Sequence, residues 1–391
     1  MTAIATIQHG VANGDDVSAE AAATDVKARR GFIPAVCDVS VTNACNATCE
    51  FCCFAVDKQI IKEKRWIDSA EFARALPILH RRGFRYVNFQ GGEPLLHPAI
   101  HTLVANSHAA GLRPALITNG WMLPRKIDSL IEAGLSTLLV SIDSHSMAAH
   151  ERNRGLNGVG ERIKTGLSIA RQNGIPTIAS VTVSRLVDYE ELPKLLEELG
   201  FDAVDFSCPR RNPLGSSSMV YNPNSTLVDF KDEELLHALD EIKLLKKRFH
   251  VQNPTAMLDE VQRHIRGETE RFACVGGYKY FYLDWNLNIW RCEAWGKPLG
   301  SVFDLDRIPD CRDRCNDCIM SCYRDASVLM HAGVAAEDAR NALAAGHVGE
   351  ATRTFFRRTV AQSIGAVLEQ APHLLRLAKK RPQHEIITRQ E

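Results

Sequence analysis

The feature that most constrains the fold is a repeat of strand-like and helix-like segments between Val36 and Phe206. Six short strand-like segments occur in this stretch, with amphipathic helical segments between them that end mostly at a glycine. One unit measures about 30 residues, the length of a strand with its crossover helix. Alternating strands and helices require right-handed crossovers and therefore a parallel sheet. The predicted fold class is α/β, and the repeat alone suits an open doubly wound sheet and a barrel equally.

The predicted elements follow this rhythm and then depart from it. Strands are expected at 35–42, 85–89, 114–118, 137–142, 176–183 and 203–206, and helices at 68–82, 97–110, 124–133, 160–172 and 189–199. After Ser207 the chain predicts a loop at 210–224, two charged helices at 232–249 and 255–266, and a hairpin at 280–290. From Asp325 onward it reads as helices.

These changes of pattern predict five regions along the 391 residues. They are a disordered lead-in at 1–34, an α/β core at 35–210, a linker with two helices at 211–266, a cysteine-rich region at 267–323 and a basic helical tail at 324–391. The lead-in lacks the basic start and apolar stretch of a secretory signal. The tail ends in Arg376 and Lys379-Lys380-Arg381, which indicates a solvated helix; contact with an acidic partner or an anionic membrane surface is the alternative.

Composition excludes several classes of function. Lys plus Arg and Asp plus Glu both number 47, so no global charge favours nucleic acid. No apolar run reaches the ~18 residues of a transmembrane helix. A cytoplasmic protein is the default expectation, and there the twelve cysteines are expected to be metal ligands more often than disulfides.

The first cysteine group is Cys45, Cys49 and Cys52, spaced C-x3-C-x2-C directly after the first predicted strand. Cys53 is joined to Cys52 by a peptide bond, so the two thiols can hardly both bind at one position of a metal site. Three protein ligands leave one coordination position open, as in a catalytic metal site. Thiolates suit zinc or an iron–sulfur cluster, and the spacing does not choose between them.

Small and polar residues follow the next strands. Gly91-Gly92-Glu93-Pro94 ends the second strand, where glycines permit close backbone approach and a carboxylate can fix an amino group; an ordinary turn is the alternative. Thr118-Asn119-Gly120 and Ser141-Ile142-Asp143 end the third and fourth strands, with helix capping as the alternative. The carboxyl ends of parallel strands form the functional face of both candidate folds.

Other residues receive plainer interpretations. Asp143, His145 and the pair Arg210-Arg211 could contact a substrate, but surface charge is the preferred interpretation for each. Cys37 and Cys208 lie in or beside strands and are expected to be small buried apolar residues.

The second cysteine group is Cys274, Cys292, Cys315 and Cys318, in which one pair closes a hairpin and the other a tight turn. Four thiolates predict a closed site, and spacing alone favours a structural zinc. Cys311 and Cys322 flank the second pair and are alternative ligands.

Together these motifs resemble the radical SAM superfamily. C-x3-C-x2-C with Phe51 before its last cysteine and Gly91-Gly92-Glu93-Pro94 after the second strand carry the resemblance, which covers 36–206. It implies a partial (β/α)6 barrel of TIM type in which Cys45, Cys49 and Cys52 hold a [4Fe–4S] cluster and S-adenosylmethionine (SAM) binds the fourth iron. Phe51 would contact the adenine. Gly91, Gly92 and Glu93 would bind the methionine amino group. Ser141, with Thr118 or Asn119, would contact the rest of SAM. The family's glycine-bearing motif on the fifth strand has no clear counterpart here.

The C-terminal cysteines resemble the auxiliary-cluster module called twitch, which is related to the longer SPASM domain. This resemblance implies that Cys274, Cys292, Cys315 and Cys318 hold a second [4Fe–4S] cluster. The expected reaction is reductive cleavage of SAM to a 5′-deoxyadenosyl radical, hydrogen abstraction from a small-molecule substrate and net oxidation, with an electron donor such as flavodoxin or ferredoxin.

Alternatives remain at this point. One is a peptide-modifying maturase, which the 44 residues before Cys45 disfavour because they are too few for a leader-binding domain. Another is an epimerase, for which Cys53, Cys208, Cys311 and Cys322 are candidate hydrogen donors. A zinc-stapled α/β binding protein and an iron–sulfur electron carrier are the alternatives of a different class.

Overall fold

The computed structural model describes residues 32–52, 54, 63–209 and 225–380. The predictions for the lead-in up to residue 31, for Cys53, for Arg210-Arg211 and for the loop that follows them lie outside the described residues.

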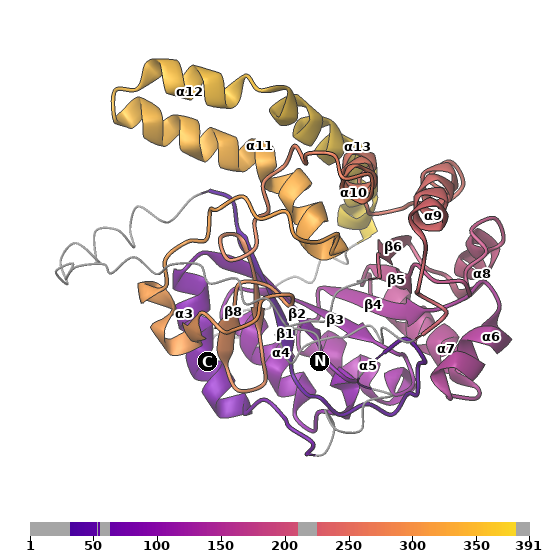
Figure 1. The fold of residues 1–391 in the computed structure, drawn as a ribbon. Coiled ribbons are helices and arrows are strands. Elements are labelled where there is room, and N and C mark those ends of the chain that lie inside the picture. Colours follow the sequence, from indigo (N-terminus) through magenta and orange to yellow (C-terminus); the bar gives the residue numbers. More distant parts are fainter. Residues whose placement is uncertain (1–31, 53, 55–62, 210–224, 381–391) are drawn as a thin grey trace, which may run out of the picture.

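The centre of the fold is a parallel sheet of six strands (Figure 1). The strands are β1 (Ala35–Ser40), β2 (Phe84–Gln90), β3 (Arg113–Thr118), β4 (Thr137–Ile142), β5 (Thr177–Thr182) and β6 (Ala203–Ser207). They lie side by side in the order of the chain. A doubly wound sheet would reverse its strand order at a switch point, whereas consecutive right-handed crossovers keep all helices on one face. The expected partial barrel of parallel strands is therefore confirmed, and it is open rather than closed.

One face of this sheet is covered by the helices of the repeat (Figure 1). They are α3 (Ser69–Arg81), α4 (Ile100–Ala109), α5 (Leu123–Glu132), α6 (Met147–Arg154), α7 (Val159–Gln172) and α8 (Leu192–Leu199). Asp68 caps α3 as predicted, because its side chain accepts from the backbone of Ala70 and Glu71. The short helix α6 was not predicted from sequence, since its mainly polar residues show little amphipathic pattern.

A hairpin extends the sheet beyond β1. The strands β7 (Tyr280–Leu283), β8 (Asn288–Trp290) and β9 (Gly300–Ser301) follow in order, and β7 pairs with β1 in parallel. Val36 is opposite Tyr280 and Val39 is opposite Leu283. All four residues of β7 are buried. The cysteine-rich segment is thus anchored to the same sheet that carries the first cysteine group.

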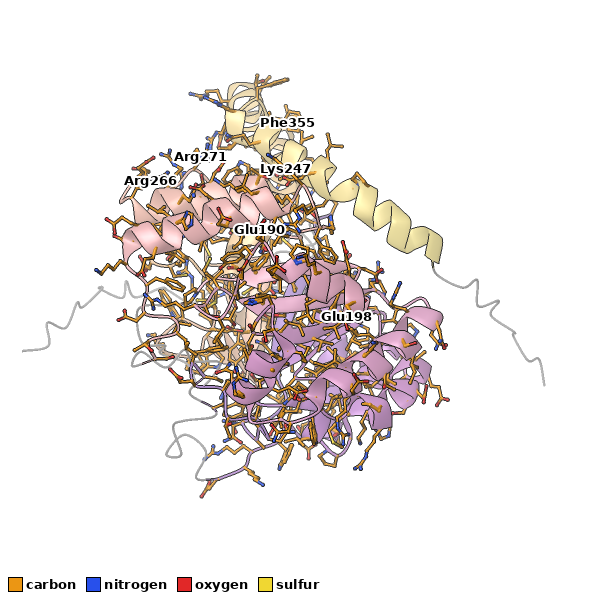
Figure 2. All side chains as sticks on the ribbon, turned by 90° about the vertical axis from the view of Figure 1, so that its right-hand side faces the viewer. Glu190, Glu198, Lys247, Arg266, Arg271 and Phe355 are labelled. Atoms are coloured by element: carbon orange, nitrogen blue, oxygen red, sulfur yellow. The ribbon has the colours of Figure 1, made fainter. Side chains whose placement is uncertain are left out.

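The remaining helices follow β6 in the chain, and among them α11 closes the inner face of the sheet (Figure 1). They are α9 (Asp232–Leu245), α10 (Thr255–Ile265), α11 (Ser321–Ala344), α12 (Val348–Phe355) and α13 (Arg358–Lys380), and the short 3-10 turns η1 (Pro94–Leu96) and η2 (Val302–Arg307) complete the chain. Helices α11 and α12 project from the body (Figure 1), and Phe355 at the end of α12 lies near the top of the view in Figure 2. Within the described ranges no helix combines the length and apolarity that crossing a bilayer requires.

Candidate functional site

The first cysteine loop leaves the carboxyl end of β1 and is held from three directions. Asn119 at the end of β3 donates its side-chain amide to the Asn46 side-chain oxygen at 2.9 Å. From the end of α6, the Arg154 carbonyl accepts from the Thr48 amide at 2.9 Å, and the loop closes internally where Cys52 N–H donates to Cys49 O at 3.1 Å. Cys45, Cys49 and Cys52 are therefore presented on a fixed backbone.

Gly91 and Gly92 are required by backbone packing. The amide of Gly92 donates to Thr42 O at 2.8 Å, and the amide of Glu93 donates to Ala44 O at 2.7 Å. A Cβ on Gly91 would lie less than 3.0 Å from Thr42 O, and one on Gly92 less than 3.0 Å from Ala44 O. Gly91 also has φ +130°, a conformation that L side chains rarely adopt. The glycines thus bring the turn after β2 against the cysteine loop.

The Glu93 carboxylate is 1% exposed and almost fully hydrogen-bonded. Its oxygens accept from the Thr118 hydroxyl at 2.6 Å, the Leu95 amide at 3.0 Å and the Asn119 amide at 2.8 Å. Burial raises the pKa of Glu93, and these three donors act in the opposite direction. A carboxylate offers about four acceptor positions, so one remains for a cationic donor such as an amino group.

A buried ion pair lies behind the cysteine loop. Arg154 donates to both oxygens of Asp143, at 2.9 and 2.6 Å, and Asn153 adds a third bond to Asp143 at 2.9 Å. Asp143 is 1% exposed, so the expected surface position is wrong for this residue. The strand end carries it inward, where only a bidentate partner such as arginine compensates the buried charge.

The thiols of this loop line a small cavity of about 140 Å³. Burial raises the pKa of both Cys45 and Cys49 to about 12, while the Arg154 charge acts to lower the pKa of each. Binding of a metal centre would replace the thiol protons, because thiolates are the ligands. The positive charge of Arg154 favours the loss of the thiol protons.

A larger cavity of about 880 Å³ opens beside the small one, inside the curved sheet. The two share a wall formed by Gln90, Ile117, Ser180 and Ser207. Alternate residues of each parallel strand line the large cavity, because successive side chains point to opposite faces of a strand. Helix α11 closes the opposite side with residues between Met320 and Met330.

The large cavity is acidic. Four carboxyl groups line it, from Asp38, Asp205, Glu293 and Asp325. Burial raises the pKa of Asp38 to about 6 and that of Asp205 to about 7. It also holds the pKa of Asp325 well above its ordinary value, and the Asp205 charge adds to this shift.

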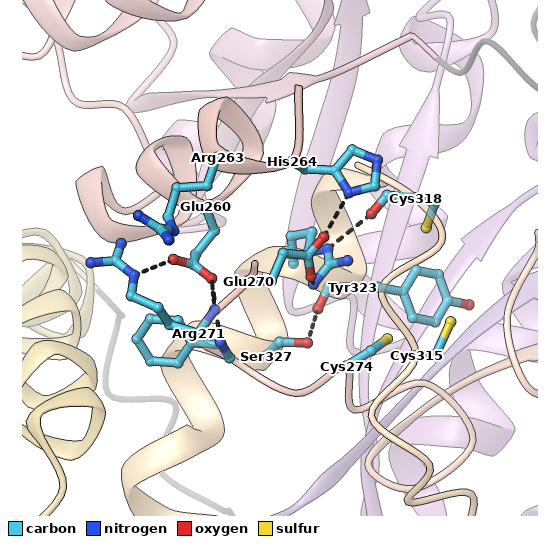
Figure 3. A network of polar contacts seen from close by, with 12 residues as sticks. Glu260, Arg263, His264, Glu270, Arg271, Cys274, Cys315, Cys318, Tyr323 and Ser327 are labelled. Atoms are coloured by element: carbon cyan, nitrogen blue, oxygen red, sulfur yellow. Dashed lines mark hydrogen bonds and ion pairs between the residues drawn. The ribbon is translucent and has the colours of Figure 1, made fainter. Parts of the chain in front are cut away.

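The second cysteine group gathers at the edge of the same cavity. Burial raises the pKa of Cys274, Cys292 and Cys315. The Cys318 charge adds to the shift of Cys274 and Cys292, and the Cys274 charge adds to that of Cys315, so the four thiols are neighbours. Figure 3 shows the thiols of Cys274, Cys315 and Cys318 beside the ring of Tyr323. Glu293 directly follows Cys292, so this group adjoins the cavity wall.

Two arginines supply positive charge to this group. Arg291 is buried, pairs with Asp313, and lowers the pKa of Cys274, Cys292 and Cys315. Arg324 donates to the Cys318 carbonyl at 2.9 Å, pairs with Glu270, and also lowers the pKa of Cys274. Both charges favour the thiolate forms that a metal centre binds.

The two alternative cysteines have different surroundings. The Cys311 side chain lies over Gly277 and beside Arg291, and Cys322 lines the large cavity. The charges that raise the pKa of Cys322 come from Glu293, Asp38, Asp325 and Asp205, after burial itself.

Neither cysteine group forms a compact single-ion site. Among the described residues, no three Cys, His, Asp or Glu side chains converge on one ion position. A tetrahedral zinc needs its sulfurs about 2.3 Å from one point, whereas thiolates around an iron–sulfur cluster bind different irons. Both groups offer only sulfur donors, which suit an iron–sulfur cluster.

The structure brings together the residues that sequence predicted for the first site. Those that line the small cavity are Cys45, Cys49, Phe51, Cys52, Gly91, Gly92, Glu93, Thr118, Asn119 and Ser141. Pro94 does not line it and instead begins the turn η1. Cys37 and Cys208 are buried, as predicted, although Cys208 also lines the large cavity.

Sequence reasoning missed Arg154 and the acidic wall of the large cavity. A sequence signal for a helix that ends at Arg154 was present, since Gly155 follows it and adopts the left-handed conformation of a helix end. The carboxylates of the wall come from β1, β6, the segment after β8 and α11. Nothing in their sequence spacing indicates that they meet.

Comparison with known proteins agrees with this geometry. A family profile described as the radical SAM superfamily matches residues 39–207. Over 166 residues the chain is 32% identical to a GTP 3′,8-cyclase of Stenotrophomonas maltophilia, which covers 41% of this chain and 50% of that protein. Over 164 residues it is 32% identical to an AdoMet-dependent heme synthase of Methanosarcina barkeri, which covers 41% and 46%. The chain thus spans about half the length of these relatives.

A solved structure supports the fold over a longer stretch. Streptococcus suis SuiB bound to S-adenosylmethionine superposes with a TM-score of 0.52 at 15% sequence identity, covering 70% of this chain and 64% of that chain. The cysteine-rich region at 274–322 is compatible with a SPASM-like module. Radical SAM proteins bind a [4Fe–4S] cluster and SAM, and the first cysteine loop with its cavity fits both. Residues 39–207 are a radical SAM domain, which places this part of the chain in the radical SAM superfamily.

Proposed function

We propose that this protein is a radical SAM enzyme that removes hydrogen from a small polar substrate in the large cavity, with a net two-electron oxidation. One observation carries the proposal: a single cavity of about 880 Å³ reaches from the wall of the first cysteine site to residues that adjoin the second cysteine group. A volume of this size suits a small-molecule ligand.

The residues of the first site have distinct tasks. Cys45, Cys49 and Cys52 would hold the cluster, and the free acceptor position of Glu93 would receive the SAM amino group. When bound and reduced, the cluster and SAM supply a 5′-deoxyadenosyl radical that abstracts a hydrogen atom. Thr118 fixes Glu93 through its hydroxyl and Asn119 does so through its backbone amide, while the Asn119 side chain donates to Asn46.

The oxidation needs two further transfers after the hydrogen atom has left. An alcohol carbon becomes a carbonyl when the substrate radical loses one electron and one proton. Cys274, Cys292, Cys315 and Cys318 would hold the group that accepts the electron, at the edge of the cavity. Asp38 lies on the cavity wall with a pKa of about 6, a range in which a carboxylate accepts a proton near neutral pH.

The proposal is tested with anaerobically reconstituted protein and dithionite. We expect about eight irons per chain, from two clusters of four, and release of 5′-deoxyadenosine from SAM. Cys49→Ala should abolish this release. Cys37→Ala is the matched control, since Cys37 is buried in β1 and lines neither cavity, and it should retain the release. A colourless protein with stoichiometric zinc would sink the proposal.

A second candidate function is epimerisation, which the position of Cys322 favours. Its thiol lines the large cavity, and burial with four nearby carboxyl groups raises its pKa, so it keeps its hydrogen. Such a thiol can return a hydrogen atom to a substrate radical, and no net electron transfer then occurs. Reaction in D₂O separates the two functions. Oxidation gives a product two hydrogens lighter, whereas epimerisation gives an isomer that carries one deuterium.

The proposal extends to partners and location. An electron carrier such as flavodoxin or ferredoxin would supply the first electron. The cytoplasm suits the chain, because all eleven cysteines among the described residues are free thiols. A peptide substrate is the alternative to a small molecule, and the substrate class is argued next.

A further inference from the structure

We propose that the substrate carries a protonated amino group, and that Asp205 and Asp325 bind this group inside the large cavity. The inference rests on the proposed function, in which this cavity holds the substrate. It names the substrate class as a small amine or amino alcohol, and it excludes an anion or a neutral hydrocarbon.

The two carboxylates are fixed by one side chain. The Asn253 amide nitrogen donates to Asp205 Oδ1 at 3.0 Å and to Asp325 Oδ2 at 2.9 Å. Asn253 is itself held by the backbone of Phe206, to whose carbonyl it donates at 3.1 Å and from whose amide it accepts at 2.7 Å. Asn253 is fully buried. This amide bridge holds two acidic groups side by side, although like charges repel.

The pair has unused acceptor capacity. Asp325 Oδ1 is buried and has no hydrogen-bond partner among the described residues. An unpaired buried oxygen of a carboxyl group costs free energy, about 1–3 kcal/mol or more when it is charged. An ammonium group has three donors and one positive charge. A bound ammonium group would donate to Asp325 Oδ1 and would also offset the repulsion between Asp205 and Asp325.

The rest of the cavity does not compensate this charge. Of the described residues that line it, Arg113 is the one with a basic side chain, and it lies exposed at the opposite end of β3, over the Tyr86 ring. Lys246, whose charge acts to lower the pKa of Asp325, donates to the Asn253 carbonyl at 2.5 Å and pairs with Glu369. Lys246 is not part of the cavity wall. The carboxyl groups of the wall therefore favour a cation of small size.

The position of the pair also suits the reaction. Asp205 and Ser207 are two residues apart on one face of β6, about 7 Å along the strand. Ser207 belongs to the wall shared with the first cysteine site. An amine held at Asp205 would therefore place its neighbouring C–H bonds near the site where the radical forms.

The test uses the reconstituted holoenzyme with SAM and three matched pairs of probes. The pairs are glucosamine with N-acetylglucosamine, glucamine with sorbitol, and putrescine with 1,4-butanediol; within each pair only the first member is cationic. We expect at least one amine to raise the melting temperature and bind in calorimetry at millimolar concentration, while its neutral partner does neither. If no amine binds better than its partner, the inference is wrong.

Two variants assign the binding to this pair. Asp205→Asn with Asp325→Asn should weaken the affinity for the best amine by at least about tenfold, since removal of a buried charge partner commonly costs more than that. Asp128→Asn, on the exposed face of α5, is the matched control and should bind as the parent does. Unchanged affinity in the double variant, or stabilisation by Mg²⁺ or Ca²⁺ but by none of the amines, would overturn the inference.

The outcome is separable from the proposed function. Release of 5′-deoxyadenosine without substrate reports the first cysteine site alone. If the parent protein releases it but binds no amine, only the substrate class is wrong. If it releases none, the proposed function fails, whatever the amines do. An iron content and a far-UV circular dichroism spectrum equal to those of the parent show that the double variant is folded and loaded.

Discussion

Arg154 and Asp143 form a bidentate ion pair directly behind the first cysteine loop, and the Arg154 carbonyl also bonds the loop at Thr48. One residue thus joins the end of β4 to the thiols that precede it by a hundred positions. The pair is buried, so its two charges depend on each other.

The first prediction concerns this pair. Arg154→Met should lower the free energy of unfolding by about 3–5 kcal/mol, because Asp143 would be left as an unpaired buried charge. Iron content should also fall. The double variant with Asp143→Asn should recover part of the stability. Arg152→Met, at an exposed position two residues earlier, is the control and should unfold like the parent in anaerobic urea titration. A single variant as stable as the control would contradict the role of the pair.

A second prediction tests the backbone approach at Gly92. Gly92→Ala should reduce stability by about 3 kcal/mol, because its Cβ would overlap the Ala44 carbonyl and the backbone would have to shift. The displaced loop should bind less iron. Gly296→Ala is the control, since nothing lies within 4 Å of the added Cβ. Melting temperature and iron per chain measure both effects, and equal values for the two variants would refute this account.

The third prediction concerns the hydroxyl that holds Glu93. Thr118→Val removes the 2.6 Å bond, so the pKa of Glu93 should rise further and its negative charge should be harder to keep. SAM affinity should fall about fivefold, as the loss of one hydrogen bond of about 1 kcal/mol predicts. Thr118→Ser keeps the hydroxyl and should restore affinity. Equilibrium binding of SAM to the reconstituted protein measures the change, and equal affinities for both variants would exclude this role.

The auxiliary cysteines give the fourth prediction. Replacing Cys315 and Cys318 by Ala should lower the iron content from about eight to about four per chain, because one of two four-iron clusters is lost. Release of 5′-deoxyadenosine should persist, since the first cysteine loop is untouched. Iron analysis and chromatography of the nucleoside measure the two effects separately. Iron that stays near eight would remove these residues from the ligand set.

The fifth prediction is a dependence of stability on pH. The pKa of Asp205 is about 7 in the folded chain and near 4 in an unfolded one. Between these values the folded state binds more protons, so the free energy of unfolding should fall as pH rises from 4 to 7 and level off above. Asp205→Asn should flatten this fall, by on the order of 2 kcal/mol. Asp38 also has a raised pKa, so some slope should remain.

Denaturant titrations between pH 5 and pH 8 measure the effect. Asp128→Asn, at an exposed position of α5, should show the same slope as the parent. If Asp205→Asn also keeps that slope, the carboxyl group does not titrate in this range. A slope of the opposite sign would mean that the unfolded state binds more protons.

The parallel sheet and the first site could be predicted from the order of residues along the chain. The alternation of strands with helices ending at glycine leaves few topologies open, and each motif at a strand end must meet the others at one edge of the sheet. Cys45, Gly92, Glu93 and Thr118 were therefore placed together before any coordinates. Their contacts are local to consecutive strands, so spacing along the chain was enough to predict them.

Only the tertiary structure decided what the cavity is made of. Asp38, Asp205, Glu293 and Asp325 come from elements far apart in the chain, and they meet because β7 pairs with β1 and α11 covers the inner face. The same packing turned Asp143 from an expected surface charge into one half of a buried pair. Each carboxylate alone is indistinguishable in sequence from a solvated one, because its surroundings depend on long-range packing that no local pattern records.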